Sequence, residues 1–320
     1  MIDEIFERAL IIGGTGFIGS NLVAELIESG CSPTVLTRNK NRHNLPDNLQ
    51  KKITQVGLDI TDFTATKRFI LDFRPTLIVN SAATLGLEDI NGKPVYHTNY
   101  EAVKNLLDTS LIAKVKRIIL FGSADEFGNQ PIPQNENLPL QPNSPYAASK
   151  AELTHLADQM YKNVGLPVII LRPFTVYGMA QPKGMFLSDA IRCALENKFF
   201  EMSEGKQMRD YIFISDFIRA IMKTIRTPDI EGEAFNIGSG QATTLREIAE
   251  KVWEISGADK SLLKIGARRA ADAELHNTCA DITKAEKVLN WCPTVSLEVG
   301  LNQTIKSIKE NLKTQHYIYS

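Results

Sequence analysis

The sequence predicts an α/β fold of the Rossmann type, in which a doubly wound parallel sheet carries a smaller C-terminal α/β substrate-binding lobe. Three observations predict this fold. Apolar segments typical of buried strands alternate with amphipathic segments of helical period through the first half of the chain. A glycine-dense turn at residues 13–19 lies between the first strand and the first helix. The 320 residues, 43% hydrophobic and 23% charged, are enough to bury a large core.

The opening unit is the most informative part of the chain. Residues 9–12 predict a buried strand, and apolar residues recur at helical spacing until Gly30 ends the helix. Glycines between the two permit a sharp turn and a close approach of the backbone to a pyrophosphate, while the helix N-terminus offers free N–H donors. This context favours a dinucleotide site over a purely structural turn. We assign to that site Gly13, Gly16, Phe17, Ile18 and Gly19.

The remaining strands and helices of the first half follow from the same patterns. Strands are predicted at 34–37, 53–58, 76–79, 117–121 and 168–171, and helices near 62–72, 94–113 and 146–163. Such alternation predicts a parallel sheet with helices on both faces, whose ligands bind beyond the carboxyl ends of the strands. The residues that follow each strand are therefore the candidates for the site.

The end of the second strand bears on the choice of cofactor. An NAD site typically has an acidic residue about 20 positions after the glycines, which binds the ribose 2′-hydroxyl. Here Arg38 follows Thr37 instead, with Lys40 and Arg42 close behind. Arginine pairs well with a 2′-phosphate, although a solvated surface loop would read the same way. We expect NADP(H) to be preferred over NAD(H), with Arg38 as a ligand.

Four further residues are assigned to the cofactor site. Asp59 and Ile60 follow the third strand, where a carboxylate can receive the adenine amino group; the alternative for Asp59 is a helix N-cap. Ala82 follows the fourth strand and lets the backbone pass close to a ligand, or reflects simple close packing. Asn99, early in the next helix, has either a buried backbone partner or a helix-capping role.

The chemistry is predicted at the end of the fifth strand and the start of the helix that follows it. Tyr146 and Lys150 are four residues apart and share one helix face. An ammonium about 4 Å away at an effective dielectric of about 20 is worth up to ~4 kcal/mol, or about three pK units. We therefore expect Lys150 to lower the pKa of Tyr146 toward neutrality, and Ser123 to hydrogen-bond the oxygen whose charge changes. Alone, such a Tyr–Lys pair is usually a solvated helix face; together with the glycine turn it indicates a catalytic set.

With these motifs the chain resembles an extended short-chain dehydrogenase/reductase of the nucleotide-sugar epimerase/dehydratase family, from about residue 9 to about residue 301. Further matching stretches are 171–178, 209–216, 234–238, Arg268-Arg269 with Asp272, and 281–285. The resemblance implies that Tyr146 is the acid/base, that Lys150 modulates its pKa and binds the ribose, and that Ser123 polarises the substrate oxygen.

The resemblance also implies a substrate site. Arg209 and Arg269 would grip the substrate diphosphate, which arginine forks suit, although either residue could instead form a surface ion pair. Asp125 and Thr175 are assigned to the same site, and Pro173 to the cofactor. Homodimerisation through helices near 100–113 and 146–163 is expected on the same ground.

Departures from the family's pattern suggest which reaction is run. Ala124 stands where many dehydratases carry an acid, while Asp125 occupies the position of their proton-abstracting glutamate. The acid-free loop at Arg38 argues against epimerases that retain NAD. Thr175 and Met179 replace the common asparagine and proline. We predict an NADPH-dependent reductase of a nucleotide-activated 4-keto-6-deoxy sugar; the alternatives are an NAD(P)-dependent 4-epimerase or 4,6-dehydratase and, in another class, a non-catalytic binding protein.

The C-terminal part is expected to interleave with the sheet. We assign residues 1–172 to an NADP-binding Rossmann domain, to which 210–242 partly return, and residues 173–320 mainly to a nucleotide-sugar lobe. Helices are predicted at 185–197, 215–226 and 297–312, a capping box at 244–247 and a loosely held tail at 315–320.

Composition limits the other function classes. A net charge of −1 without blocks of like charge gives no reason to expect a nucleic-acid partner. The four cysteines are scattered, the N-terminus lacks a basic region, and no apolar run reaches the ~18 residues of a membrane span. We therefore expect a cytoplasmic protein with reduced thiols and no membrane partner. The five histidines show no ligand spacing, so no metal is expected.

Overall fold

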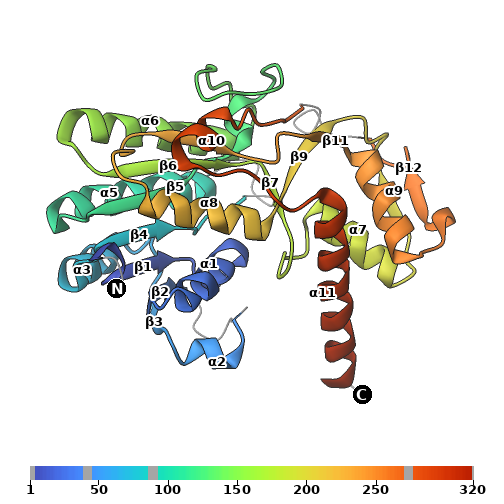
Figure 1. The fold of residues 1–320 in the computed structure, drawn as a ribbon, viewed down its shortest axis with the longest axis horizontal. Helices are drawn as coiled ribbons and strands as arrows, with labels where there is room; N and C mark the ends of the chain where they lie inside the picture. Colours follow the sequence, from blue (N-terminus) through green and yellow to red (C-terminus); the bar gives the residue numbers. More distant parts are fainter. Residues whose placement is uncertain (1–3, 39–44, 86–92, 270–276, 319–320) are drawn as a thin grey trace.

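A seven-stranded parallel sheet forms the centre of the structure, a computed structural model that describes residues 4–38, 45–85, 93–269 and 277–318 (Figure 1). The strand order is β10-β6-β5-β4-β1-β2-β3. These strands are β1 (Ala9–Ile12), β2 (Thr34–Thr37), β3 (Thr54–Gly57), β4 (Leu77–Asn80), β5 (Arg117–Phe121), β6 (Val168–Pro173) and β10 (Ala234–Ile237). Each neighbouring pair is parallel, which confirms the predicted doubly wound fold.

Helices cover both faces of the sheet. On one face lie α1 (Phe17–Glu28) and α8 (Ile214–Arg226); on the other lie α3 (Phe63–Phe73), α5 (Ala102–Ala113) and α6 (Pro145–Val164). Alternate residues of β1 pack against the helices on opposite faces of the sheet. Ile11 packs in the core on the α1 and α8 face, while Leu10 and Ile12 pack in the core on the other face. All three are fully buried, so the strand reads as a continuous apolar run.

The helix predicted over 94–113 differs from a regular helix. It consists of α4 (Lys93–Tyr96), a π-helical turn at His97–Glu101, and α5. A short helix α2 (Asp47–Gln50), which the sequence did not predict, precedes β3. Single π-helical turns frequently occur at functional sites because they redirect one side chain.

The second half of the chain adds two small sheets beside the main one. One contains β7 (Thr175–Tyr177), β9 (Met208–Phe213) and β11 (Ala242–Thr244), and the other contains β8 (Phe200–Met202) and β12 (Leu263–Ile265). The helices of this half besides α8 are α7 (Phe186–Leu195), α9 (Leu245–Ser256), α10 (Thr283–Leu289) and α11 (Leu297–Ile318). One apolar cluster includes Leu22 of α1, Trp253 of α9 and Leu301 of α11, so the two halves share a continuous core.

The ends of two C-terminal helices test particular predictions. The capping box is confirmed: the Thr244 hydroxyl accepts from Glu247 N at 3.1 Å, and the Glu247 carboxylate accepts from Thr244 N at 2.9 Å. Helix α11, which extends away from the body in Figure 1, runs to Ile318. The predicted tail at 315–320 is thus helical as far as Ile318.

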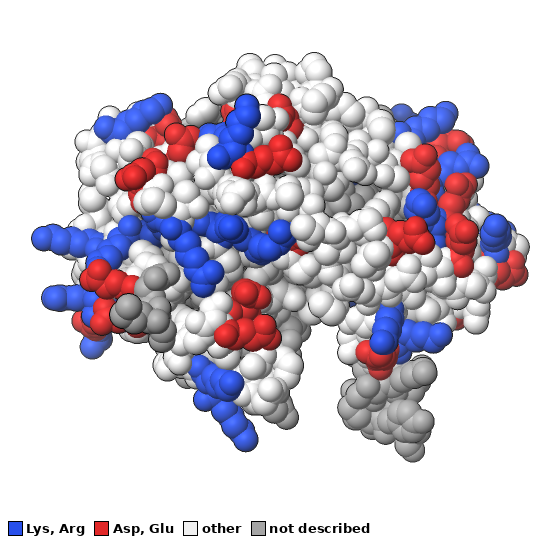
Figure 2. All heavy atoms as spheres, in the orientation of Figure 1, with Lys and Arg blue, Asp and Glu red and all other residues white. Residues whose placement is uncertain are grey.

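The surface seen in Figure 2 carries acidic and basic side chains together, with a row of basic ones over α8, whose last turn holds Lys223 and Arg226. Within the described ranges, no helix is long and apolar enough to cross a membrane. The same ranges contain no group of three or more His, Cys, Asp or Glu side chains arranged to hold a metal ion.

Candidate active site

Particular glycines of the turn between β1 and α1 leave no room for a side chain. A Cβ at Gly19 would lie 2.3 Å from the Gly13 carbonyl oxygen, and one at Gly13 would lie 2.8 Å from Ala82 N. Gly13 also has a φ of +75°, which favours glycine. These contacts hold the turn against both α1 and the loop after β4, so Ala82 does lie beside the turn, as close packing requires.

The start of α1 fits the phosphates of a dinucleotide. The helix begins at Phe17 with Gly16 as its N-cap, and no side chain caps it. The first-turn amides of Phe17 and Ile18 therefore lack a side-chain acceptor, and Gly16 is exposed. Uncapped amides at a helix N-terminus, beside a turn of glycines, attract anionic groups.

At the end of β2, where NAD sites typically have a carboxylate, a threonine hydroxyl is paired with one from the glycine turn. The buried hydroxyls of Thr15 and Thr37 are hydrogen-bonded at 2.9 Å. Arg38 follows and is exposed at the end of the described stretch. The predicted basic neighbours Lys40 and Arg42 lie outside the described residues.

Asp59 does not cap a helix. Its Oδ1 accepts from the Thr61 amide at 3.0 Å and from the Thr61 hydroxyl at 2.8 Å. Helix α3 is capped by Asp62, whose Oδ1 accepts from Ala65 N at 2.9 Å. The N-cap alternative for Asp59 is therefore wrong, because the helix begins three residues later than that role requires; Ile60 beside it is buried.

Asn99 lies in the π-helical turn and is 1% exposed. Its Oδ1 accepts from Thr84 N at 2.9 Å, and its Nδ2 donates to Thr84 O at 2.9 Å and to Ser149 Oγ at 3.3 Å. Of the two roles considered, the buried backbone partner is confirmed and the helix cap is wrong. Asn99 thus links the loop after β4 to α6. Its partner on α6, Ser149, directly precedes Lys150 in the sequence.

The structure brings Ser123, Tyr146 and Lys150 together. The Ser123 hydroxyl accepts from Asp125 N at 3.1 Å and donates to Asp125 Oδ2 at 3.3 Å, and it lies close enough to the Tyr146 side chain to lower the pKa of that phenol. Lys150 is buried, with Nζ 5.8 Å from the centre of the Tyr146 ring and donating to the Phe121 carbonyl at 2.8 Å. One phenol, one hydroxyl and one amine therefore meet at the carboxyl end of β5.

The pKa of Tyr146 is shifted in the direction opposite to the one expected. Burial raises it, the Asp125 carboxylate raises it further, and the hydrogen bond from Ser123 opposes both. Burial also lowers the pKa of Lys150 to about 8, which the Glu126 carboxylate opposes. The expected lowering of the Tyr146 pKa is thus wrong for the protein alone, because burial penalises the charged forms of both groups. A phenol held in this way is protonated at neutral pH.

Two of the five predicted substrate residues lie on the small three-stranded sheet. Thr175 is half-buried on β7, just after Pro173 at the end of β6, and Arg209 is half-buried on the neighbouring strand β9, with Nη1 donating to Met208 O at 2.9 Å. Arg269 is exposed, so the structure does not bring it into the buried set. Asp272 lies outside the described residues.

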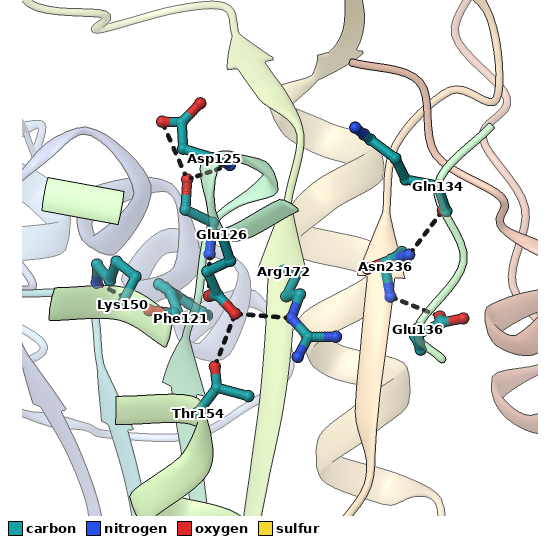
Figure 3. Close-up of polar contacts among 10 residues, drawn as sticks. Phe121, Asp125, Glu126, Gln134, Glu136, Lys150, Thr154, Arg172 and Asn236 are labelled. Atoms are coloured by element: carbon teal, nitrogen blue, oxygen red, sulfur yellow. Dashed lines mark hydrogen bonds and ion pairs between the residues drawn. The ribbon is translucent and has the colours of Figure 1, made fainter. Parts of the chain in front are cut away.

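A buried ion pair beneath the site was not predicted. Glu126 and Arg172 are 0% and 4% exposed, and the Arg172 Nε lies 2.9 Å from Glu126 Oε2 (Figure 3). The sequence holds one signal for it, an arginine at the end of the apolar run 168–171; the burial of Glu126 between buried Ala124 and Phe127 is seen only in the structure.

Comparison with known proteins places this geometry among nucleotide-sugar enzymes. A model described as "NAD dependent epimerase/dehydratase family" matches residues 9–238. A UDP-glucose 4-epimerase of Mycolicibacterium smegmatis is 30% identical over 315 residues, covering 93% of this chain and 97% of its own. A UDP-glucose 4-epimerase from Thermotoga maritima, solved with UDP-glucose, has a TM-score of 0.88 at 26% identity, covering 95% and 99% of the chains. A dTDP-glucose 4,6-dehydratase from Bacillus anthracis, solved with NAD, has a TM-score of 0.84 at 25% identity, covering 96% and 97%.

Proposed function

The chain belongs to the NAD-dependent epimerase/dehydratase family, and we propose that it moves a hydride between a nicotinamide and C4 of a nucleotide-activated hexose, with 4-epimerisation as the net reaction. The observation that carries this proposal is the meeting of Ser123, Tyr146 and buried Lys150 at the carboxyl end of β5, with Lys150 Nζ 5.8 Å from the centre of the Tyr146 ring. The similar UDP-glucose 4-epimerases favour the epimerase outcome. Ala124, in place of an acid, disfavours dehydration.

The residues of the chain divide the work as follows. Residues 13–19 and Lys150 would hold the dinucleotide, which supplies the hydride acceptor or donor and, when oxidised, a positive charge on its ring. Tyr146 gives its proton to the sugar oxygen when the keto carbon is reduced and takes it back in the reverse step. Ser123 hydrogen-bonds the same oxygen and steadies its developing charge. Because the phenol is protonated in the protein alone, added positive charge is needed before it acts as a base.

A second candidate is the reduction of a nucleotide-activated 4-keto-6-deoxy sugar by NADPH. The end of β2 favours it: the Thr37 hydroxyl is hydrogen-bonded to that of Thr15, residues 34–38 contain no carboxylate, and Arg38 is exposed where a 2′-phosphate would bind. A reductase consumes its cofactor, which suits a site that selects NADPH, whereas the related dehydratase structure holds NAD.

The experiment that decides between these reactions tests the same purified protein with each type of substrate. Purified protein is incubated with UDP-glucose without added cofactor, and separately with NADPH and a 4-keto-6-deoxy nucleotide sugar. Formation of UDP-galactose supports the epimerase, oxidation of NADPH supports the reductase, and a 4-keto product from an unreduced hexose supports a dehydratase. If Tyr146→Phe converts its substrate as fast as the wild type, the epimerase, reductase and dehydratase assignments are all refuted.

We also propose a homodimer formed through α5 and α6. Both helices carry large apolar side chains in contact with solvent, with exposed fractions of 60% for Ile112 on α5 and 52% for Val164 on α6. Burial of such side chains against a second copy is favourable. Sedimentation of a monomer at micromolar concentration would contradict this proposal. Within each subunit, we propose that residues 1–172 with 210–242 hold the dinucleotide and that 173–320 mainly hold the sugar nucleotide.

A further inference from the structure

Glu126 has no role in the reaction proposed above, yet its carboxylate is fully buried directly behind the site. Its Oε1 accepts from Ser123 N at 2.7 Å, and its Oε2 accepts from Thr154 Oγ1 at 3.0 Å and from Arg172 Nε at 2.9 Å (Figure 3). Three donors converge on two oxygens, which is the hydrogen bonding of an ionised carboxylate. Burial raises the pKa of this carboxyl group, and its three donors oppose that rise, while Arg172 Nη1 is buried without a hydrogen-bond partner among the described residues.

The partners of Glu126 come from the three elements that surround the reacting groups. Ser123 follows β5, Arg172 lies on β6 next to Pro173, and Thr154 lies on α6 one turn after Lys150. Lys150 itself donates to the Phe121 carbonyl at the end of β5. Helix α6 is therefore fastened to the end of β5 at two successive turns, once through Lys150 and once through Glu126.

We propose that Glu126 is a positioning residue, which fixes the Ser123 loop against α6 and β6 so that the Ser123 and Tyr146 hydroxyls stay in hydrogen-bonding reach. The inference rests on the proposed function, since it is there that both hydroxyls act on the sugar oxygen. A stabilising role alone explains the pair poorly, because the desolvation of a buried ion pair largely offsets its attraction. A fixed alignment of reacting groups, by contrast, is worth large factors in rate.

Two further observations support a coupling between Glu126 and the site. A Cβ at Gly122 would lie 2.3 Å from Glu126 Oε1 and 3.0 Å from Arg172 Cγ, so the pair fills the space against the strand end completely. The Glu126 charge also raises the pKa of both Tyr146 and Lys150. The carboxylate thus acts on the reacting groups through geometry and through its field.

The test compares Glu126→Gln and Thr154→Val with a matched control. Thr154→Val removes one hydroxyl that bonds Glu126, while Thr224→Val removes an equally buried helical hydroxyl that bonds only its own helix, at Ala220 O. We expect kcat on a nucleotide sugar to fall roughly 10- to 100-fold in Glu126→Gln and several-fold in Thr154→Val, with dinucleotide Kd within about twofold, and no change in Thr224→Val.

A second readout does not depend on turnover. The titration of Lys150, followed by NMR of the ¹³C-dimethylated amine, lies near pH 8 in the wild type and is expected to move about one unit lower in Glu126→Gln, together with the pH–rate profile. Unchanged kcat in both variants and an unmoved Lys150 titration would overturn the proposal. If the wild type turns over no nucleotide sugar while the titration still moves, the proposed reaction fails and the coupling by Glu126 stands.

A double variant covers the case in which Glu126→Gln does not fold. Glu126→Leu with Arg172→Met replaces the ion pair by apolar side chains of similar volume, a change that other buried pairs tolerate. We expect this protein to fold and bind dinucleotide yet turn over roughly tenfold or more slowly, because the Ser123 amide has lost its acceptor. Wild-type kcat in the folded double variant would overturn the proposal.

Discussion

Substituting alanine for Gly19 tests whether the turn after β1 holds the dinucleotide. The new Cβ would lie 2.3 Å from the Gly13 carbonyl oxygen, 2.7 Å from Gly14 Cα and 2.8 Å from Ser81 Oγ, whereas ordinary contacts begin at 3.4 Å. Two of the three atoms belong to the backbone, so a change of side-chain rotamer cannot relieve these two contacts. The turn and α1 must therefore separate by about 1 Å, because close-packed interiors have no spare volume.

The two consequences of this shift differ in size. Overpacking destabilises by about 1–3 kcal/mol, and the higher helix propensity of alanine returns up to about 1 kcal/mol, so the free energy of unfolding falls by roughly 0–3 kcal/mol. Hydrogen bonds to a charged group are worth about 1.5–3 kcal/mol each. Misplacing even one backbone amide from the pyrophosphate thus weakens dinucleotide binding by roughly 10- to 150-fold.

Urea unfolding and fluorescence titration with NADH and NADPH measure the two quantities separately. Gly165→Ala is the matched control: this glycine ends α6 with a φ of +68°, and a Cβ added there would meet nothing within 4 Å beyond its chain neighbours. It is expected to lose about 1–2 kcal/mol through its left-handed backbone and to keep the wild-type Kd. A Gly19→Ala protein that binds both dinucleotides within twofold of the wild type would refute the assignment of the glycine turn.

Four shorter predictions follow from the same structure. Tyr146→Phe is expected to lower kcat by about 10²–10⁴-fold at unchanged dinucleotide Kd, measured by steady-state kinetics and titration. Arg38→Ala is expected to raise the Kd for NADPH about 10- to 100-fold and leave that for NADH unchanged; equal effects would contradict the 2′-phosphate role. Asp216 is 1% exposed and accepts hydrogen bonds from the amides of Thr294 and Val295. Asp216→Ala is therefore expected to lower the free energy of unfolding by about 3–5 kcal/mol, whereas Asp158→Ala, at a surface ion pair, should lower it by about 0.5 kcal/mol or less; urea unfolding measures both. Burial lowers the pKa of Lys150 from 10.5 to about 8, so between these values this group binds more protons in the unfolded state. The wild type should therefore gain stability relative to Lys150→Met as pH rises across them, while the raised pKa values of the Cys31 and Cys279 thiols act in the opposite direction in both proteins.

The main sheet could be predicted because parallel strands buried on both faces carry their own signal. Residues 9–12 and 117–121 are apolar or fully covered along their whole length, and a turn signal bounds each of them. The π-helical turn at 97–101 had no such signal. It depends on Asn99 reaching the backbone of Thr84, a contact between segments that the sequence alone does not bring together.

For Ser123, Tyr146 and Lys150, residue spacing predicts which side chains are neighbours but not how their pKa values shift. Spacing of four residues on a helix correctly predicts that Tyr146 and Lys150 are neighbours. It contains no information on how much water surrounds them, and burial raises one pKa and lowers the other. The direction of a pKa shift therefore needs the fold, because the charge–charge effect and the desolvation effect have opposite signs here.

Gly122 and Glu126 illustrate why the support behind a site is harder to predict than the site itself. The sequence alone assigns no role to Gly122 or to Glu126, which follow the predicted strand at 117–121. In space, the carboxylate occupies the position where a Cβ of residue 122 would stand, and Arg172 closes the far side. Gly122, Glu126 and Arg172 therefore depend on one another. A side chain at position 122 would collide with the carboxylate, and loss of Glu126 or Arg172 alone would leave the other charge buried and unpaired. Such mutual dependence is visible only when β5 and β6 lie side by side, as residues 118–121 and 168–171 do here.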